Sequence, residues 1–404
     1  MRQRPVVIDP AGRDIHGEAR SLRRHGCVAP VELPDGIRAW APTGYQALRR
    51  LLADDRVSKD PNQHWPLWRN GEFRASWINT WVGVSNMLTA YGADHRRLRR
   101  LISPAFTRRR VDALRPRIEE ITTTLLDRMA ADPDGRAELR TDFAHPLPMG
   151  VICELFGVPE DRRADTARLV SEIFDTTATD EQAVATLLEV QDLLARLVAA
   201  KREHPDDDLT SVLIATRDEE GSGLTETELV GTLLLLIGAG HETTVNLIGN
   251  AVHALLSHPA QLARVRAGDV PWSDVIEETL RWAPPIANLP LRFAVEDIEL
   301  PDGTTVARGD AVLATYAAAG RDPLRHGPDA DSFDITRPDK EHLAFGHGVH
   351  FCVGAPLARL EASIALPALF ARFPGLRADE ESAPAARLDS FIANGFATFP
   401  VRLR

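Results

Sequence analysis

Two short stretches of the chain carry side chains that could take part in catalysis or bind a metal, and the first surrounds Cys352. The stretch "AFGHGVHFCVGAP", residues 344–356, places this cysteine in a glycine-rich loop. Pro356 suits the first turn of a helix, so we expect Cys352 to lie just before a helix N-terminus. The backbone N–H groups and the dipole there favour a thiolate. Such a thiolate can act as a nucleophile or as a metal ligand.

The second stretch, "GAGHETT" at 238–244, lies in the middle of a long apolar segment. Thr225 and Glu228 have the spacing of a capping box, which predicts a helix from 226 to about 256. A helix this long and apolar should be buried, and a carboxylate and hydroxyls in its middle are costly unless they are paired.

Thr243 can bond back to the carbonyl of Ala239 and loosen the helix locally. We interpret Glu242 and Thr243 as an acid and an alcohol that deliver protons to something bound in a gap beside Gly240. A close helix crossing that needs small residues is the alternative, but it explains the glycines and not the acid.

Three kinds of site are compatible with the cysteine loop. His347, His350 and Cys352 are candidate zinc ligands, although the C-x-x-C spacing typical of structural zinc is missing. A Cys–His nucleophile is a second possibility. A haem-iron thiolate is the third, and it requires glycines beside a flat ring, cations for two propionates and a distal helix with a gap. This third interpretation gives both stretches a role.

Composition and charge exclude several classes of protein. Hydrophobic residues make up 44% and charged residues 26% of 404 residues, which is normal for a globular protein. The net charge of −11 argues against general affinity for nucleic acid. The longest apolar run, 229–240, is too short to span a bilayer. With three widely spaced cysteines, a disulfide framework is not expected, and we predict a soluble, cytoplasmic protein.

The hydrophobic pattern predicts a mainly α protein with small β-sheets (α+β), forming a single domain over 1–404. Helical periodicity occurs in the segments 110–131, 160–177, 181–203, 226–257 and 274–283, and after Pro356. Strands are predicted near the N-terminus, over 291–315 with a turn at Asp302-Gly303, and at 396–403. No βαβ alternation is visible, which excludes a doubly wound sheet.

Three motifs in matching order resemble the cytochrome P450 family over nearly the whole chain. The loop pattern F-x-x-G-x-x-x-C-x-G is met by Phe345, Gly348, Cys352 and Gly354. The helix pattern A-G-x-[DE]-T-T is met by Ala239, Gly240, Glu242, Thr243 and Thr244. The E-x-x-R pair is met by Glu278 and Arg281, although Glu277 has suitable spacing to Arg281 as well. The stretches "VSKDPNQHW" and "TAYGADHRRLRRL" look most like actinobacterial hydroxylases of steroids and macrolides.

The resemblance implies a haem b (iron protoporphyrin IX) between the long distal helix and the cysteine loop. Cys352 would be the axial iron ligand, and Phe345, Gly346 and Gly354 would contact the haem. His95, Arg99, Arg292 and His350 would bind its propionates. Glu278 and Arg281 would brace the loop, and Arg337 is the candidate for a third basic residue, because Ser332 stands where the family often has arginine.

The resemblance also implies monooxygenase activity, with O₂ as cosubstrate and electrons from NAD(P)H through a ferredoxin and its reductase. The arginines at 96–100 and 108–110 would suit such an acidic partner, and we expect a monomer. Pocket residues would be Met87, Ala239, Thr243, Asn288, Leu289 and Ile392. A steroid is the first expectation for the substrate, and hydroxylation or epoxidation of a macrolide or polyketide is the alternative. The alternative from another functional class is a haem sensor or binding protein that catalyses no reaction.

Overall fold

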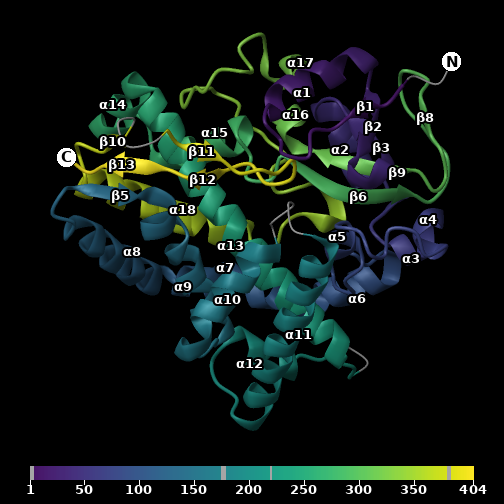
Figure 1. Cartoon of the computed structure of the whole chain (residues 1–404), viewed down its shortest axis with the longest axis horizontal. Coiled ribbons are helices and arrows are strands. Elements are labelled where there is room, and N and C mark those ends of the chain that lie inside the picture. The colour runs from purple at the N-terminus through teal and green to yellow at the C-terminus, as the bar shows by residue number, and fades with distance from the viewer. Residues whose placement is uncertain (1–3, 174–178, 219–220, 380–383) are drawn as a thin grey trace.

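Helices dominate the computed structural model, which describes residues 4–173, 179–218, 221–379 and 384–404. Figure 1 shows the long helix α13 (Glu226–Ser257) running through the middle of the molecule, with helices on one side and the largest sheet on the other. The fold is therefore mainly α with small sheets, as predicted from the sequence. Within the described ranges, no helix combines the length and the apolar character that crossing a membrane requires.

The remaining α-helices vary from one turn to six. They are α1 (Ile15–Leu22), α2 (Tyr45–Ala53), α3 (Pro61–His64), α4 (Pro66–Arg69), α5 (Asn79–Val82), α6 (Gly92–Ile102), α7 (Arg108–Ala113), α8 (Arg115–Ala130), α9 (Pro146–Phe156), α10 (Glu160–Ile173), α11 (Asp180–Glu203), α12 (Leu209–Ala215), α14 (Pro259–Ala267), α15 (Trp272–Trp282), α16 (Tyr316–Gly320), α17 (Pro323–His326) and α18 (Ala355–Arg372). A π-helix, η4, spans Arg140–Ala144.

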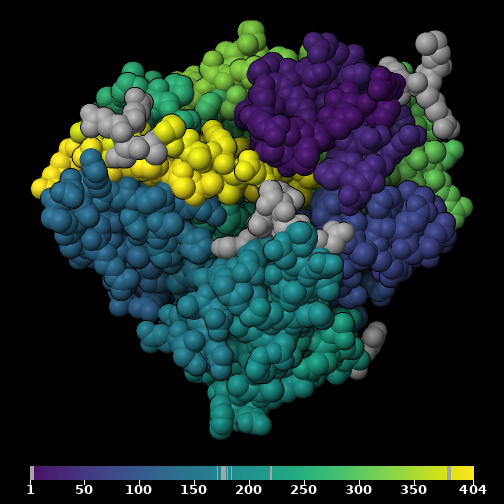
Figure 2. All heavy atoms as spheres, viewed as in Figure 1, coloured from purple at the N-terminus to yellow at the C-terminus, as the bar shows by residue number. Residues whose placement is uncertain are grey.

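The strands form one six-stranded sheet and three small ones. The large sheet has the order β1 (Val6–Val7), β2 (Val28–Leu33), β3 (Ile37–Pro42), β9 (Ala311–Thr315), β6 (Asn288–Ala294) and β4 (Val57–Ser58). The others pair β10 (Arg377–Ala378), β13 (Pro400–Arg402) and β5 (Arg136–Glu138), then β11 (Ala386–Arg387) with β12 (Phe396–Thr398), and β7 (Ile298–Glu299) with β8 (Thr305–Val306). In Figure 2 the C-terminal strands (yellow) lie between the N-terminal region (purple) and α8 (blue).

The central helix α13 begins and ends where its sequence predicts. The Thr225 hydroxyl accepts from the backbone N–H of Glu228, whose side chain accepts in return from the N–H of Thr225. The helix stops before Pro259, which begins α14. At 1.5 Å per residue its 32 residues span about 48 Å. This length lets α13 contribute both to the core at one end and to a cavity near its middle.

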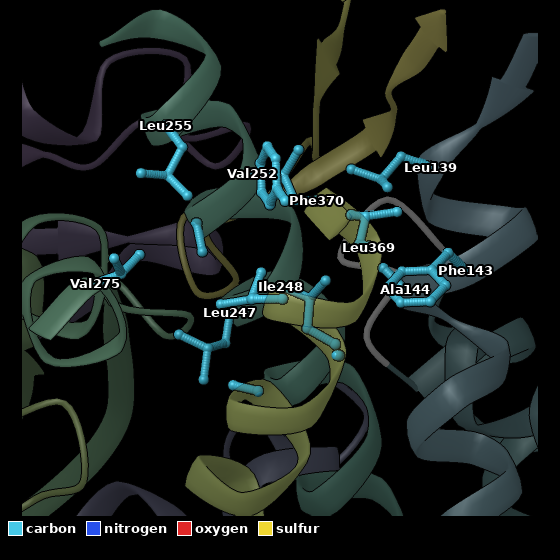
Figure 3. Packing of buried hydrophobic residues seen from close by; sticks show 14 of the residues in the cluster. Leu139, Phe143, Ala144, Leu247, Ile248, Val252, Leu255, Val275, Leu369 and Phe370 are labelled. Atoms are coloured by element: carbon cyan, nitrogen blue, oxygen red, sulfur yellow. The ribbon is translucent and has the colours of Figure 1, made fainter. Parts of the chain in front are cut away.

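The main hydrophobic core forms where the second half of α13 meets α15, α18 and η4. Figure 3 shows Leu247, Ile248, Val252 and Leu255 of α13 packed near Leu369 and Phe370 of α18, Val275 of α15, and Leu139, Phe143 and Ala144 at η4. These side chains are nearly all inaccessible to solvent. Close packing of this kind fixes the position of α13 relative to the segment that precedes α18.

Two elements differ from the sequence-based expectation. The segment 110–131 forms two helices, α7 and α8, with the boundary at Leu114, because Pro116 in the first turn of α8 lacks the N–H that a continuous helix requires. The expected final strand divides at Phe399 into β12 and β13, which join different sheets. The turn at Asp302-Gly303 does connect two strands, β7 and β8, and Gly303 adopts a φ of 80°.

A fully buried ion pair holds the segment 320–332 against α15. Arg281 donates from Nε and one terminal nitrogen to the two carboxylate oxygens of Glu278, each at 2.7 Å. Its guanidinium also donates to the carbonyls of Gly320, Ala330 and Ser332, each at 2.8 Å. Arg337 lies 3.7 Å from Glu278. Because all of these donors and acceptors are used, the pair can remain charged without water.

The spacing in the sequence would allow Arg281 to pair with either Glu277 or Glu278. In the structure Glu277 has other partners, so Arg281 pairs with Glu278. Arg359 of α18 donates to both of its oxygens, at 2.6 and 2.9 Å, and His342 lies 3.0 Å away. Burial alone would raise the pKa of Glu277, but these hydrogen bonds outweigh it and lower the pKa to about 2. Glu277 therefore connects α15 to α18, whereas Glu278 connects α15 to the loop 320–332.

Another acid of α18, Glu361, is buried without a cation. It is 1% exposed, and one of its carboxyl oxygens has no hydrogen-bond partner among the described residues. Burial raises the pKa of this carboxyl to about 8. Glu361 is therefore largely protonated at neutral pH, and its ionisation opposes folding.

We expect Glu361→Gln to stabilise the protein in a pH-dependent way. The folded-state pKa of about 8 lies above the unfolded value, so the wild type loses stability as pH rises from about 4.5 to about 8. The glutamine variant lacks this loss, so its free energy of unfolding relative to wild type should rise over the same window and then level off. Urea unfolding at several pH values measures the difference. A difference that does not vary with pH would contradict the assignment.

Candidate active site

One cavity of about 300 Å³ lies between the middle of α13 and the loop that leads into α18. It brings together segments that are more than a hundred residues apart in the sequence. Its lining includes these residues singled out from the sequence: Met87, Arg99, Ala239, Gly240, Thr243, Leu289, Arg292, Phe345, Gly346, His350, Cys352 and Gly354. The cysteine loop and the acid–alcohol stretch therefore face one shared space.

Four other candidate residues lie outside this lining. His95 is buried beside it, with its ring 4.1 Å from that of His350. Asn288 donates to the carbonyl of Phe391 at 2.7 Å, and Ile392 is completely buried. Glu242 points to the other side of α13. The bracing residues Glu278, Arg281 and Arg337 also lie outside the lining.

The cysteine loop is shaped by two left-handed glycines and by the helix after it. Gly346 and Gly348 have φ values of 75° and 71°, and a Cβ on Gly348 would lie 2.7 Å from the carbonyl oxygen of Leu52. The N–H of Cys352 donates to the carbonyl of Phe345 at 2.9 Å, which closes the loop. Three residues later α18 begins, as predicted. The cysteine side chain is thereby directed into the cavity.

The electrostatic surroundings of the Cys352 sulfur combine opposing effects. Burial raises the pKa of its thiol, while the N–H groups of Gly354 and Ala355 and the positive charges of Arg99 and Arg359 offset part of that rise. A side chain at Gly354 would have its Cβ 3.8 Å from the sulfur. The sulfur thus has hydrogen-bond donors behind it and open space in front, which is the arrangement of a metal-ligating thiolate.

On the opposite wall, α13 presents small residues and hydroxyls. Thr243 donates to the carbonyl of Ala239 at 2.6 Å, as expected from the sequence, and Thr244 donates to that of Gly240 at 3.1 Å. A Cβ on Gly240 would lie 2.6 Å from the end of the Ile152 side chain. Gly240 therefore serves a close helix contact and also leaves room beside Thr243 in the cavity.

Glu242 is held by an ion pair that the sequence did not reveal. Arg140 of η4 donates from one nitrogen to both carboxylate oxygens of Glu242, at 2.9 and 3.0 Å. Burial raises the pKa of Glu242, and Arg140 counteracts that rise. The adjacent His241 and His145 have pKa values lowered by burial to about 3 and about 4, so both rings are neutral at pH 7. Arg140 is thus the principal cation that stabilises the Glu242 charge.

Basic side chains gather at the other end of the cavity without a carboxylate. His95, Arg99, Arg292 and His350 lie there, and the pKa of each is lowered first by burial. For His95 and His350, the positive charges of neighbouring basic side chains lower the pKa further. The buried Nε2 of His95 and Nε of Arg292 have no hydrogen-bond partner among the described residues.

These unpartnered donors test whether the site fits the expected cofactor. Buried nitrogen donors are costly unless they meet an acceptor. A haem carries two carboxylates, and a cavity that holds Cys352 at one wall and unpaired cations at its edge suits both the iron and those carboxylates. A metal ion held by side chains alone is less suitable, because no three His, Cys, Asp or Glu residues within the described ranges are grouped to hold one.

Four residues of the site were not singled out from the sequence. Arg140 pairs with Glu242, Tyr316 hydrogen-bonds to Arg292, Lys59 lies buried near Arg292, and Asn86 lines the cavity. Arg140, Tyr316 and Lys59 act through contacts between distant segments, which no local motif predicts. Lys59 does lie in the stretch "VSKDPNQHW", whose one signal in the sequence is its resemblance to actinobacterial hydroxylases.

Comparison with known proteins agrees with this site. A family model described as Cytochrome P450 matches residues 189–268 and 272–391. The chain is 46% identical, over 99% of its length and 98% of the relative's, to the 2-hydroxy-5-methyl-1-naphthoate 7-hydroxylase of Streptomyces carzinostaticus. Among solved structures, CYP154A1 from Streptomyces coelicolor is 51% identical with a TM-score of 0.93, covering 99% of this chain and 100% of that one.

A second solved structure, testosterone-bound CYP154C4 from a Streptomyces species, is 43% identical with a TM-score of 0.94, covering 99% of this chain and 98% of that one. These relatives align over 99% of this chain, so the similarity extends across the regions of the cysteine loop, the distal helix and the bracing pair. The protein belongs to the cytochrome P450 family and is a monooxygenase.

Proposed function

We propose that the protein is a haem-thiolate monooxygenase that hydroxylates an apolar, polycyclic substrate with an oxygen at one end, and that a steroid is its first candidate. The observation that carries this proposal is the single cavity in which Cys352 faces Thr243 across apolar walls. A haem bound there supplies the activation of O₂ and the insertion of one oxygen atom into a C–H bond.

The donor set favours haem b, held without covalent attachment. Cys352 supplies a sulfur ligand, and Arg99, Arg292 and His350 line the edge where carboxylates would lie. Cys27, Cys153 and Cys352 are far apart in the sequence, so the C-x-x-C-H motif that attaches c-type haem is absent from the chain. Because residues 346 and 354 are glycines, no side chain from these two positions occupies the space near the sulfur where the cofactor would bind.

The role that we propose for Thr243 and Glu242 is proton delivery. The Thr243 hydroxyl donates to the Ala239 carbonyl, so its oxygen lone pairs remain available to a proton donor in the cavity. Glu242 lies one residue away but binds Arg140, whose side chain is 14% exposed. Uptake of a proton from the solvent side of α13 would neutralise Glu242 and weaken its attraction to Arg140. Rotation of the neutral carboxyl group would then bring that proton toward the Thr243 oxygen.

The wall residues favour an uncharged, apolar substrate. The charged side chains of the lining are Arg99, Arg292 and Glu361, and the first two belong to the basic group at the cavity edge. The rest of the chamber is mainly apolar and includes Trp81, Val84, Met87, Leu88, Ile152, Ile173, Leu187, Leu234, Leu235, Leu236, Pro285, Ile286 and Leu289. Such walls bind apolar substrates because binding removes hydrocarbon surface from water. This interaction is non-directional, so it discriminates little between substrates of similar apolar area.

The polar side chain of Asn86 interrupts this mainly apolar surface. Its Oδ1 accepts from the backbone N–H groups of Leu88 and Thr89, at 2.9 and 3.3 Å, which determines the orientation of the amide. Its Nδ2 donates to no described residue, although Asn86 is 6% exposed and lines the cavity. We infer that this N–H₂ group binds a carbonyl or hydroxyl oxygen of the substrate.

Two relatives support a polycyclic substrate of this kind. One is named for hydroxylation of a substituted naphthoate, and the structure of another contains testosterone. A naphthoate carries a carboxylate, and the apolar part of the described lining has no cation to pair with it. A neutral ketosteroid needs no such cation and suits both the apolar walls and Asn86. A macrolide or polyketide is the alternative substrate.

Electrons would come from a ferredoxin, supplied by its reductase and NAD(P)H, as is typical of bacterial members of the family. The side chains of Val349 and Phe351 in the cysteine loop are exposed, at 59% and 44%. Arg96, Arg108 and Arg109 are exposed on α6 and α7. Exposed arginines suit an acidic protein partner, with attraction that weakens as salt increases.

Cys352→Ser tests the ligand assignment. We expect the variant to fold, because Cys352 holds its loop through the backbone N–H and not through sulfur. Its reduced carbonyl complex should lose the thiolate-type absorption that the family shows, since a serine oxygen is a different ligand. Absorption spectroscopy of the reduced, CO-treated protein measures this. Persistence of the thiolate-type band would remove Cys352 from the iron.

Thr243→Ala tests proton delivery. The variant should bind haem and substrate as wild type does but divert reducing equivalents to hydrogen peroxide, because the hydroxyl that positions the proton is gone. Hydroxylated product per NADPH consumed is the measurement. Thr244→Ala is the matched control, since its hydroxyl also bonds back to the helix and should affect coupling less. Equal coupling in wild type and Thr243→Ala would exclude the relay.

Asn86→Asp tests the substrate class. Aspartate keeps the acceptor for the Leu88 and Thr89 N–H groups but lacks the donor. We expect testosterone to bind wild type with a low- to high-spin shift and the variant roughly tenfold more weakly, as loss of one buried hydrogen bond predicts. An oxygen-free sterane should bind both equally. Tighter binding of a macrolactone than of testosterone would favour the alternative substrate, and ligand binding without substrate-dependent NADPH consumption would indicate a non-catalytic haem protein.

A further inference from the structure

A lysine is buried near the cavity, and none of the described residues supplies it with an acidic partner. Lys59, which follows β4, is 1% exposed, and its Nζ has a single long hydrogen bond, 3.4 Å, to the carbonyl of Pro290. An ammonium group has three N–H donors and is strongly hydrated in water. A fully buried lysine with one weak bond is therefore far from satisfied, and an apolar side chain of equal length would be cheaper to bury.

The strand register explains where this lysine points. β4 and β6 are antiparallel, with Val57 opposite Ala294 and Ser58 opposite Phe293. One step further along the same register, Lys59 is opposite Arg292. Directly opposed residues have their side chains on the same face of the sheet, with Cβ atoms about 5 Å apart. Lys59 and Arg292 thus form a cross-strand pair of like charge, which is normally destabilising.

No carboxylate in the described ranges relieves this repulsion. Neither Lys59 nor Arg292 takes part in an ion pair there, and the single charged neighbour that affects Lys59 is Arg292 itself. Burial and Arg292 together lower the pKa of Lys59 well below its ordinary value. The positive charge of Lys59 also acts on His350, which lines the cavity with Arg292. The like-charged pair is therefore continuous with the basic group at the cavity edge.

We propose that Lys59 is a further cofactor-positioning residue, whose charge, placed behind Arg292 and His350, is balanced by the carboxylates of the bound haem. Lys59 is not part of the cavity lining, so it acts through Arg292 and not by direct contact. The proposal rests on haem binding, as proposed above. Without a bound dianion, the positive charges of Lys59, Arg99 and Arg292 repel one another. With haem bound, these three cations would face the two negative charges of its carboxylates.

The first experiment measures haem retention. Lys59→Met removes the charge but keeps most of the buried volume, and Lys59→Arg keeps the charge. We expect the methionine variant to lose haem to excess apomyoglobin on the order of tenfold faster than wild type, and the arginine variant to resemble wild type. The ferric/ferrous reduction potential of Lys59→Met should be lower, because a nearby cation favours the more negative, reduced state.

A cofactor without carboxylates provides the matched control. With iron protoporphyrin IX dimethyl ester, wild type and Lys59→Met should lose the cofactor at equal rates. The haem-free form of Lys59→Met should be at least as stable to urea as haem-free wild type, since an uncompensated charge has been removed. If Lys59 served only packing, haem-free Lys59→Met would be less stable than haem-free wild type. The variant would then also lose haem and its dimethyl ester faster than wild type by the same factor. Either result would overturn the proposal.

A second measurement needs no variant at position 59. The chain has three lysines, Lys59, Lys201 and Lys340, and the other two are paired with Asp208 and Asp274. Their side-chain ¹⁵N signals in labelled protein can be assigned with Lys201→Arg and Lys340→Arg. The side-chain signal of Lys59 should titrate at a lower pH in the haem-free protein and with the ester than in the diamagnetic reduced carbonyl complex with haem. An unchanged titration would overturn the proposal, whereas failure to bind haem at all would instead refute the proposed function.

Discussion

The position of one sulfur atom constrains the rest of this molecule. Cys352 must project from a loop that turns sharply enough to leave its side chain in open space, and this requires left-handed backbone at Gly346 and Gly348. The loop is short and rests on the carbonyl of Leu52, so it depends on its neighbours for rigidity. Those neighbours are α18, the ion pair of Glu277 with Arg359, and the core that joins α13 to α18. The packing around these helices therefore determines the distance across the cavity.

The buried charged side chains of this protein fall into three groups, which differ in how completely their charges are paired. Glu278 and Arg281 satisfy each other and nearby carbonyls completely, so this pair stabilises one conformation. Glu242 and Arg140 form a simpler pair, with one nitrogen serving two oxygens, at the edge of solvent. A pair of this kind can open at lower cost than the first. The third group, around Arg292, contains basic side chains without an acidic partner among the described residues.

Local signals in the sequence predicted those parts of the structure that depend on local physics. The capping box and apolar run of α13, the back-bonded Thr243 and the start of α18 after Cys352 are all consequences of neighbouring residues. The partner of Arg281 was ambiguous from spacing alone, because Glu277 and Glu278 both suit it on an isolated helix. The structure selects between them through Arg359 and His342, which come from elsewhere in the chain. Arg140, Lys59 and Tyr316 were missed for the same reason, since their roles arise from contacts between segments.

The incomplete basic group links cofactor binding to folding. A ligand that binds only the folded state stabilises it in proportion to the logarithm of its concentration relative to its dissociation constant. Here the unpartnered donors of His95 and Arg292, and the repulsion between Lys59 and Arg292, are costs that the chain bears alone and that an anion relieves. A side chain such as aspartate at the cavity edge would have stabilised the empty fold, but it would compete for the same cations. Binding of a cofactor with carboxylates at this edge would therefore add to the stability of the fold.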